Sequence, residues 1–290
     1  MVPSDNNLHA PGASPWVDED LRESIAELGI RTIEDGWSDL LQGEIVHDRG
    51  ERQVIRLAAP DGEHSYYLKR WRVAPYSPKR YLPLSFNTRY RTRNEFGNLT
   101  HLKELGLTVP KPIFFAEKKG VWGPDASILL LVELQPYTCC LELADQEEHR
   151  ERIAIGIAEI LGQLHSNDLF YRSPGLKHFY LHNTDTAASL ALLDVAGIQK
   201  QPTGLRKHLQ TWIKSDMPGR NRDLSKVTLT LRGELGAADS VIDSFWSAYG
   251  KIVGLDSDSL SSCRKEAEED ASWRLMERKK RFAPPSQPRA

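Results

Sequence analysis

The period of the apolar residues changes along this chain of 290 residues, and the order of the changes limits the folds that it can adopt. Three short segments near the start, GEIVHDRG, RQVIRLAAPDG and HSYYLKRWRV, are apolar or alternating and are separated by Asp-Arg-Gly and Asp-Gly turns. Segments of this kind, joined by such turns, are typical of consecutive antiparallel strands. The sequence therefore predicts an antiparallel sheet in the first part of the chain.

A helical period replaces the strand period from Arg89 onward. In RYRTRNEFGNLTHLKELG the apolar residues recur at three-residue steps, and Gly106 is placed to end the helix. These apolar residues are Phe96, Leu99, Leu102 and Leu105. The segments VPKPIFFAEKKG and ASILLLVELQPY then predict two further strands, of which the second is apolar enough to be buried on both faces.

The part after Tyr137 is mostly helical in pattern. HRERIAIGIAEILGQLHSND carries the single apolar stripe of a long core helix. GLRKHLQTWIKS, DSVIDSFWSAYGKIV and the charged run from about Ser259 to Phe282 predict further helices. A sheet-rich half followed by a helical half indicates an α+β protein with two lobes. The predicted parts are a disordered N-terminus (1–16), an N-terminal lobe (17–136), a C-terminal lobe (137–282) and a disordered tail (283–290).

Composition argues against several classes of protein. The formal net charge of −2 disfavours a generally basic nucleic-acid-binding protein, and we expect no nucleic-acid partner. No apolar stretch approaches the roughly 20 residues that span a bilayer. The first residues also lack the basic-then-apolar order of a signal peptide, so a cytoplasmic protein is expected. The three cysteines and nine histidines show no metal-ligand spacing, and we expect no metal held by the protein alone.

Four side chains occur in an order that phosphoryl-transfer chemistry would explain. They are Lys69 at the end of a strand-like segment, Glu95 on the inner face of the next helix, His178 in the loop after the long helix, and Asp194 after the apolar segment SLALL. In kinases a strand lysine paired with a helix glutamate holds the phosphates of ATP, and a strand-end aspartate with a loop side chain holds Mg²⁺. Each residue taken singly has a commoner structural explanation. Their joint order predicts an ion pair between Lys69 and Glu95, and one metal ion shared by His178 and Asp194.

These segments resemble the Kdo/WaaP lipopolysaccharide kinase family, whose members have a protein-kinase-like fold and phosphorylate sugars of the lipopolysaccharide inner core. YYLKRW is similar to the family's strand with the ATP lysine, and RNEFGNLTHLKELGLTVPKPIFFAE is similar to its helix with the paired glutamate and the strand that follows. ILLLVELQPYTCCLEL resembles the hinge. LGQLHSNDLFYRSPGLKHFYL and LALLDVAG resemble the catalytic and metal-binding loops, and the resemblance covers roughly residues 40–250.

The resemblance implies a bilobal kinase-like fold, with a sheet and one helix in the N-terminal lobe, and it implies ATP and Mg²⁺ as cofactors. It also implies a role for each matching residue. These residues are Lys69, Glu95, Glu133 and Gln135 for the nucleotide, with the backbone near Glu133 to Gln135 at the adenine; His178 and Asp194 for the metal; and Arg172 and Ser173 for catalysis. Asp168, at the end of the preceding helix, is a further catalytic candidate because its carboxylate could assist the transfer. The acceptor that it implies is a hydroxyl of Kdo or heptose.

One position departs from the kinase pattern. With Arg172 on the arginine of the His-Arg-Asp loop, Ser173 stands in place of the aspartate that accepts the nucleophile's proton. A serine hydroxyl does not accept that proton at neutral pH, and a positioned base contributes about 10²–10⁴-fold to the rate. Two hypotheses stay open: a kinase with unusual chemistry, assisted by Asp168 or a substrate group, and an inactive nucleotide-binding pseudokinase or scaffold. A hydrolase using Ser173 is disfavoured because no Gly-x-Ser-x-Gly elbow is present.

Two basic segments bear on the choice of partner. Residues 69–93 contain eight Lys or Arg and no Asp or Glu, with aromatic residues between them, and WRLMERKKRF near the C-terminus is also basic. An ordinary solvated surface would explain both segments. A second explanation is contact with an anionic glycolipid, such as the lipopolysaccharide core or a lipid A precursor, or with the inner face of the inner membrane.

Overall fold

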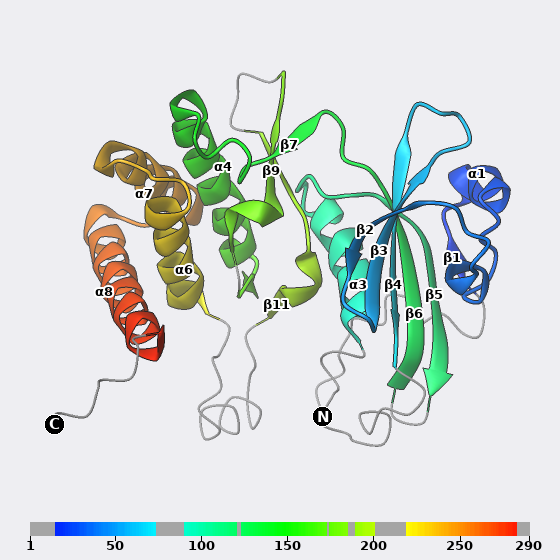
Figure 1. Ribbon diagram of the computed structural model, residues 1–290. Helices are drawn as coiled ribbons and strands as arrows, with labels where there is room; N and C mark the ends of the chain where they lie inside the picture. The colour runs from blue at the N-terminus through cyan, green and yellow to red at the C-terminus, as the bar shows by residue number, and fades with distance from the viewer. Residues whose placement is uncertain are drawn as a thin grey trace, which may run out of the picture. The chain divides into compact units, whose positions relative to one another are not determined.

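The computed structural model describes residues 15–73, 90–120, 123–172, 174–184, 189–200 and 219–282 (Figure 1). These residues form two compact units, of which the first contains the chain up to Gln135 together with Leu192–Gly197 and the second contains the rest. Several sequence predictions lie outside the described residues. They are Ser173, the helix expected over 204–215, the part of the basic stretch between 74 and 89, and nearly all of the termini expected to be disordered (1–14 and 283–290).

The first unit is built on a six-stranded sheet with the order β1-β5-β6-β4-β3-β2. All neighbouring strands in it are antiparallel. The strands are β1 (Trp16–Val17), β2 (Glu44–Asp48), β3 (Arg52–Ala58), β4 (Ser65–Arg72), β5 (Pro112–Gly120) and β6 (Gly123–Val132). The helical elements of this unit are η1 (Glu19–Leu21), α1 (Arg22–Glu27), η2 (Asp35–Trp37), α3 (Arg91–Glu104) and η6 (Val195–Gly197).

Different helices cover the two faces of this sheet. On one face Ile128 of β6 packs in a core that includes Ile25 of α1. On the other face the hydroxyl of Ser127 donates a 2.8 Å hydrogen bond to Thr92 Oγ1 of α3. Successive residues of a strand point to opposite faces. A strand covered on both faces has an uninterrupted apolar sequence, which explains the run from Ile128 to Leu131 in β6.

Helix α3 follows the apolar stripe that the sequence predicts. Its residues Phe96, Leu99 and Leu102 are buried, and the ring of Phe96 stacks on Phe115 of β5 with 4.8 Å between ring centroids. The helix is closed by Gly106, whose φ of +80° is a left-handed conformation that glycine adopts without a steric penalty. The predicted helix and its glycine end are both confirmed.

The second unit is mainly helical. Its long helices are α4 (Glu147–Ser166), α6 (Arg220–Gly233), α7 (Asp239–Val253) and α8 (Ser257–Phe282). Its short elements are β7 (Tyr137–Cys139), β8 (Leu169–Phe170), η5 (Leu176–His178), β9 (Phe179–His182), β10 (Leu190–Leu192, of which Leu192 is counted in the first unit) and β11 (Gln199–Lys200). Strands β10, β9 and β7 form one small sheet in that order, and β8 pairs with β11.

Close packing of α4 on α7 forms the centre of the second unit (Figure 1). Ile153, Ile157 and Leu164 lie buried along α4, as the predicted stripe requires. Gly162 allows α7 to approach closely, because a Cβ atom at this position would come within 2.7 Å of Ile252. An antiparallel sheet in the first part and a helical second part confirm the predicted α+β class.

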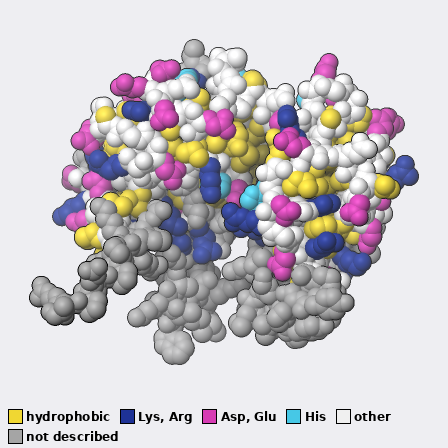
Figure 2. Space-filling model, viewed as in Figure 1, with side chains coloured by type: hydrophobic (Ala, Val, Ile, Leu, Met, Phe, Trp, Pro, Cys, Tyr) yellow, Lys and Arg dark blue, Asp and Glu magenta, His cyan; other side chains and the backbone are white. Residues whose placement is uncertain are grey.

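Charged side chains of both signs are interspersed over the described surface of each unit in the view of Figure 2, in keeping with the small net charge. Within the described ranges, no helix combines the length and the apolar character needed to cross a membrane.

Candidate functional site

The predicted pair of Lys69 and Glu95 is present. Lys69 lies opposite Leu129 across the β4–β6 pair, and directly opposed residues of antiparallel strands point to the same face. This is the face of the sheet that α3 covers, and the Lys69 ammonium makes an ion pair with Glu95 Oε1, one turn into α3. The Glu95 side chain is only 3% exposed, so Lys69 compensates a buried carboxylate.

Asp194 belongs to the same unit, although it is far from α3 in the sequence. The Leu192 amide donates to the Thr108 carbonyl at 2.9 Å, and the Asn98 side chain of α3 donates to the Val195 carbonyl at 2.7 Å. These two hydrogen bonds place Asp194 beside α3. Arg91, the first residue of that helix, donates from Nη2 to both Asp194 oxygens, at 2.9 and 3.0 Å.

The pKa of Asp194 is lowered from its ordinary value. Burial alone would raise that pKa, but the positive charges of Arg91, Lys69 and Arg52 and the Arg91 hydrogen bonds together outweigh it. The carboxylate is therefore ionised throughout the neutral range. Arg91 and Glu95 are four residues apart on α3 and share one face of the helix. Lys69, Arg91, Glu95 and Asp194 thus form a compact group of two cations and two carboxylates, which we call the charge cluster.

The Glu133 side chain has structural partners of its own. Its carboxylate accepts hydrogen bonds from the Tyr67 hydroxyl at 3.0 Å and from Gln135 Nε2 at 2.7 Å, and it pairs with Arg56 at 3.1 Å. Burial would raise the pKa of Glu133, but these three partners together lower it. The Glu133 amide donates to the Ser65 carbonyl at 2.9 Å. These bonds fix the chain that leaves β6, where the sequence predicts an adenine-binding backbone.

In the second unit, Arg172 lies in a loop whose backbone is hydrogen-bonded to side chains of α6. The buried carboxylate of Asp223 accepts hydrogen bonds from the Tyr171 amide at 2.6 Å and the Arg172 amide at 2.8 Å, and it lies 3.4 Å from His165 Nε2. The Lys226 ammonium donates to the Arg172 carbonyl.

Two further residues of α6 continue this pattern. Thr230 donates to the Pro174 carbonyl at 3.1 Å, and Glu234, the residue that caps α6, accepts from the Leu176 amide at 3.2 Å. We call Asp223, Lys226, Thr230 and Glu234 the α6 clamp. Their spacing of three or four residues puts them on one face of the helix. The sequence analysis did not predict this helix, although the buried residues Leu224, Val227 and Leu231 repeat at the same helical spacing.

Two other predicted residues of the second unit are described, His178 and Asp168. His178 ends the turn η5, and its ring meets that of Tyr171 edge-on at 6.0 Å. Asp168 is exposed at the end of α4. Among the residues that are described, the non-glycine positions with positive φ are Asp168 (55°), Arg172 (66°) and Asp194 (53°). Strained backbone of this kind concentrates at functional sites, and all three positions are candidates from the sequence.

A metal site made by the protein alone is not found in the described part of the chain, where no three His, Cys, Asp or Glu residues gather. Asp194 still offers a partly exposed, ionised carboxylate, the oxygen donor that Mg²⁺ prefers. Mg²⁺ in phosphate sites needs only one or two carboxylates beside the phosphates, so the residues present fit such an ion.

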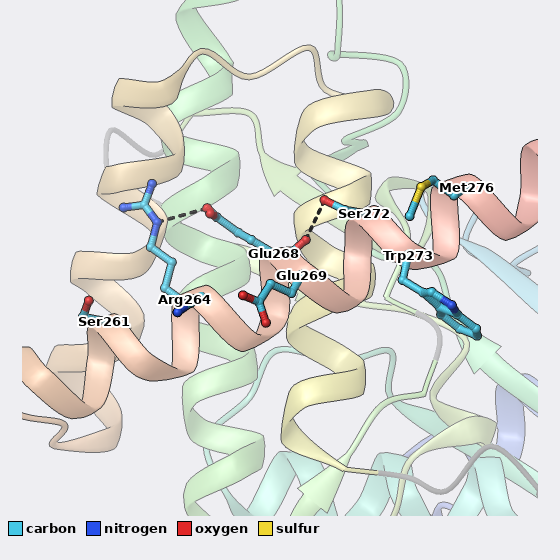
Figure 3. Close-up of a pocket in the computed structure, with 8 residues that line it drawn as sticks. Ser261, Arg264, Glu268, Glu269, Ser272, Trp273 and Met276 are labelled. Carbon is cyan, nitrogen blue, oxygen red and sulfur yellow. Dashed lines mark hydrogen bonds and ion pairs between the residues drawn. The ribbon is translucent and has the colours of Figure 1, made fainter.

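A hollow of about 530 Å³ lies along the outer side of α8. Every residue that lines it comes from this one helix, including Arg264, Glu268, Trp273 and Met276 (Figure 3). None of the candidate site residues is among them, and a site formed by a single helix face lacks the walls that a nucleotide pocket needs. We therefore interpret it as a surface feature.

Comparisons with known proteins agree with this geometry. The model of the lipopolysaccharide kinase (Kdo/WaaP) family matches residues 39–232 of the chain. Comparison with curated proteins gives no match. A solved structure of WaaP in complex with acyl carrier protein is similar with a TM-score of 0.59 and 18% identity, over 88% of this chain and 98% of that chain, which shows a shared fold. Lower scores come from the kinase-methyltransferase WbdD (TM-score 0.42, 14% identity, 77% of this chain and 47% of that chain) and a Toxoplasma gondii rhoptry antigen kinase domain (0.45, 12%, 80% and 83%).

Proposed function

Because the chain belongs to the lipopolysaccharide kinase (Kdo/WaaP) family, we propose that it binds ATP in its first unit and transfers a phosphoryl group to a hydroxyl of an inner-core sugar, Kdo or heptose. The observation that carries this proposal is the charge cluster. A strand lysine is fixed by a buried helix carboxylate, and an ionised aspartate lies beside them in the same unit. An ammonium that is already oriented needs no reorganisation when phosphates bind, which is how positioned charges favour phosphoryl transfer.

In this proposal each residue of the first unit has one task. Lys69 contacts the phosphates, and Glu95 keeps its ammonium in position. Asp194 holds Mg²⁺, which when bound neutralises charge on the phosphates. The Glu133 carbonyl and the Gln135 amide, two residues apart on the chain leaving β6, contact the adenine. The support for that last assignment is the set of hydrogen bonds that fixes the Glu133 side chain and amide.

The transfer step depends on the loop that the α6 clamp holds. The residues proposed to act there are Arg172, Ser173, Asp168 and His178, of which His178 is the second metal ligand. The support is the family resemblance together with the strained backbone at Arg172 and Asp168. With serine in place of the base, transfer proceeds by positioning and charge stabilisation. We expect a rate below the ~1–100 s⁻¹ of ordinary kinases, by up to the ~10²–10⁴-fold that a base contributes.

Two observations favour a second candidate function, an inactive nucleotide-binding pseudokinase or scaffold. Ser173 stands where the base belongs. Arg91 already occupies both oxygens of the carboxylate that a kinase would give to Mg²⁺.

ATP binding is tested first, by thermal unfolding of the protein with increasing ATP and Mg²⁺. We expect a concentration-dependent rise in Tm that Lys69→Met abolishes, while Lys118→Met, which removes an exposed lysine paired with Glu34, leaves it intact. Transfer is then measured with γ-labelled ATP and purified core oligosaccharide. Label in the sugar supports the kinase, and binding without label supports the pseudokinase. A Tm that ATP does not change would overturn both.

We also propose that the protein works in the cytoplasm at the inner face of the inner membrane, where its glycolipid acceptor and ATP meet. The support is the end of α8. Trp273 and Met276 are more than half exposed and line the same hollow. The helix backbone continues through the basic sequence Arg278, Lys279, Lys280 and Arg281. Exposed aromatic and apolar side chains next to basic residues favour contact of a helix end with an anionic lipid surface.

Vesicle sedimentation tests this contact. We expect the protein to sediment with vesicles that contain phosphatidylglycerol and to stay in solution with phosphatidylcholine alone. Trp273→Ser with Met276→Ser should weaken binding, and Leu40→Ser, which removes another exposed apolar residue, should not. Equal binding to both kinds of vesicle, or no effect of the α8 substitutions, would contradict the proposal.

A further inference from the structure

The charge cluster contains one residue to which the proposed nucleotide site assigns no task. Arg91 uses a single nitrogen, Nη2, to bind both carboxylate oxygens of Asp194. Two charge-assisted hydrogen bonds to one carboxylate are among the strong polar contacts in proteins. The oxygens that would bind Mg²⁺ are therefore held by a cation of the protein itself.

The position of Arg91 is set by the fold and does not depend on a mobile side chain alone. Arg91 is the first residue of α3. Asn98 of the same helix donates a hydrogen bond to the carbonyl of Val195, which is the residue after Asp194. Helix α3 is thus hydrogen-bonded to the backbone beside Asp194, which places Arg91 at the Asp194 carboxylate. Glu95, one turn further along the same helix, makes an ion pair with Lys69.

The balance of charge in the cluster is informative. Lys69 and Arg91 carry two positive charges, and Glu95 and Asp194 carry two negative charges. Without Arg91, the Asp194 carboxylate would face an incoming polyphosphate as an uncompensated anion. With Arg91, that repulsion is cancelled before any metal binds.

We propose that Arg91 is an internal counter-ion that lets nucleotide bind without a divalent metal, and that Arg91 and Mg²⁺ compete for Asp194. The ligand class is a nucleoside polyphosphate. Mg²⁺ binds in a step separate from the nucleotide, and it binds Asp194 more weakly than it would without Arg91. This inference rests on the proposed ATP site and concerns only how that site treats the metal.

The test is a comparison of two dissociation constants for ATP, one in EDTA and one in excess Mg²⁺, by displacement of a fluorescent ATP analogue. The measured quantity is the Kd in EDTA divided by the Kd in Mg²⁺. Because a substitution that weakens ATP binding in general changes both constants alike, this ratio reports only the dependence on the metal. For the unaltered protein we expect a ratio within about threefold of unity. For Arg91→Gln we expect a ratio of about tenfold or more, because ATP must now bring a metal to neutralise Asp194, and the metal no longer has a competitor.

Two further variants separate this role from a structural one. Arg93→Gln removes the other arginine of the same helical turn, which pairs with Glu117, and should keep the ratio of the unaltered protein. The double variant Arg91→Gln with Asp194→Asn should return the ratio toward unity, because it removes the charge that needs compensation. Loss of packing at Arg91 alone would not be rescued in this way.

A strong dependence on Mg²⁺ in the unaltered protein would overturn the inference and leave the proposed ATP site standing. So would a ratio that Arg91→Gln leaves unchanged. Failure of ATP to bind in either buffer, in folded protein, would overturn the proposed function itself and this inference with it.

Discussion

Asp223 offers the sharpest test of how the structure holds its loop. Its carboxylate is fully buried and accepts the amides of Tyr171 and Arg172 at 2.6 and 2.8 Å. We predict that Asp223→Ala destabilises the second unit strongly, because both amides lose their acceptor. A hydrogen bond to a charged group contributes about 1.5–3 kcal/mol, so two such bonds give about 3–6 kcal/mol. For a unit of this size, about 4 kcal/mol corresponds to a fall in Tm of about 8–16 °C.

Urea unfolding followed by circular dichroism would measure this change as a free energy of unfolding. Asp223→Asn keeps the shape and one acceptor oxygen, and should cost about half as much. Asp239→Ala is the matched control: it also removes a helix aspartate, but the side chain is 82% exposed and its ion pair with Arg232 should contribute within about 1 kcal/mol. An Asp223→Ala variant as stable as the Asp239→Ala control would refute the reasoning.

Three further predictions concern the proposed site. Lys69→Met should cost about 3–5 kcal/mol by urea unfolding, because it leaves the buried Glu95 carboxylate unpaired, and Lys69→Met with Glu95→Gln should recover most of that loss without recovering ATP binding. Asp194 has a lowered pKa when folded, so its contribution to stability is complete above its unfolded pKa of about 3.9 and is lost as the pH falls through the folded value. As the pH is lowered below about 4, the Tm of Asp194→Asn should therefore fall less steeply than the Tm of the unaltered protein. An equally steep fall in both proteins would count against the pairing of Asp194 with Arg91. Ser173→Asp should raise phosphoryl transfer by up to about 10²–10⁴-fold, limited because Pro174 biases the preceding residue toward an extended backbone. A neutral effect in an active enzyme would mean that the base lies elsewhere, with Asp168 the next residue to substitute.

Local patterns were enough to predict much of the first unit. The period of three in residues 91–105 and the glycine that follows predicted α3 and its end, since side chains three or four apart share a helix face and glycine tolerates positive φ. Lys69 and Glu95 were matched because each is defined by its place within one element, a strand and an inward helix face. Lys69 lies inside β4 and not at its end as predicted, because the pairing with β6 continues to Arg72. The family resemblance rests on the same local motifs, and the family model confirms it.

Partners far apart in the chain were not predicted. Arg91 and Asp194 are separated by 103 positions, and nothing in either segment indicates the other. The α6 clamp was missed for the same reason: Asp223 lies 52 positions after Tyr171, and no local pattern pairs its carboxylate with the amides of that loop. A buried polar residue satisfies a particular distant group, and this gives no periodic signal along the sequence.

The α+β class, the helix with the paired glutamate and the family could all be predicted from the sequence, because they depend on periodicity, turn chemistry and short motifs. The partners of Asp194 and of the loop at Arg172 became known only from the three-dimensional structure. The predicted metal-binding carboxylate is held by an arginine, and the predicted catalytic loop is held by a buried aspartate. Both contacts depend on how distant segments pack against one helix, since the energy of an ion pair or hydrogen bond is set by distances of a few ångströms that no local pattern encodes.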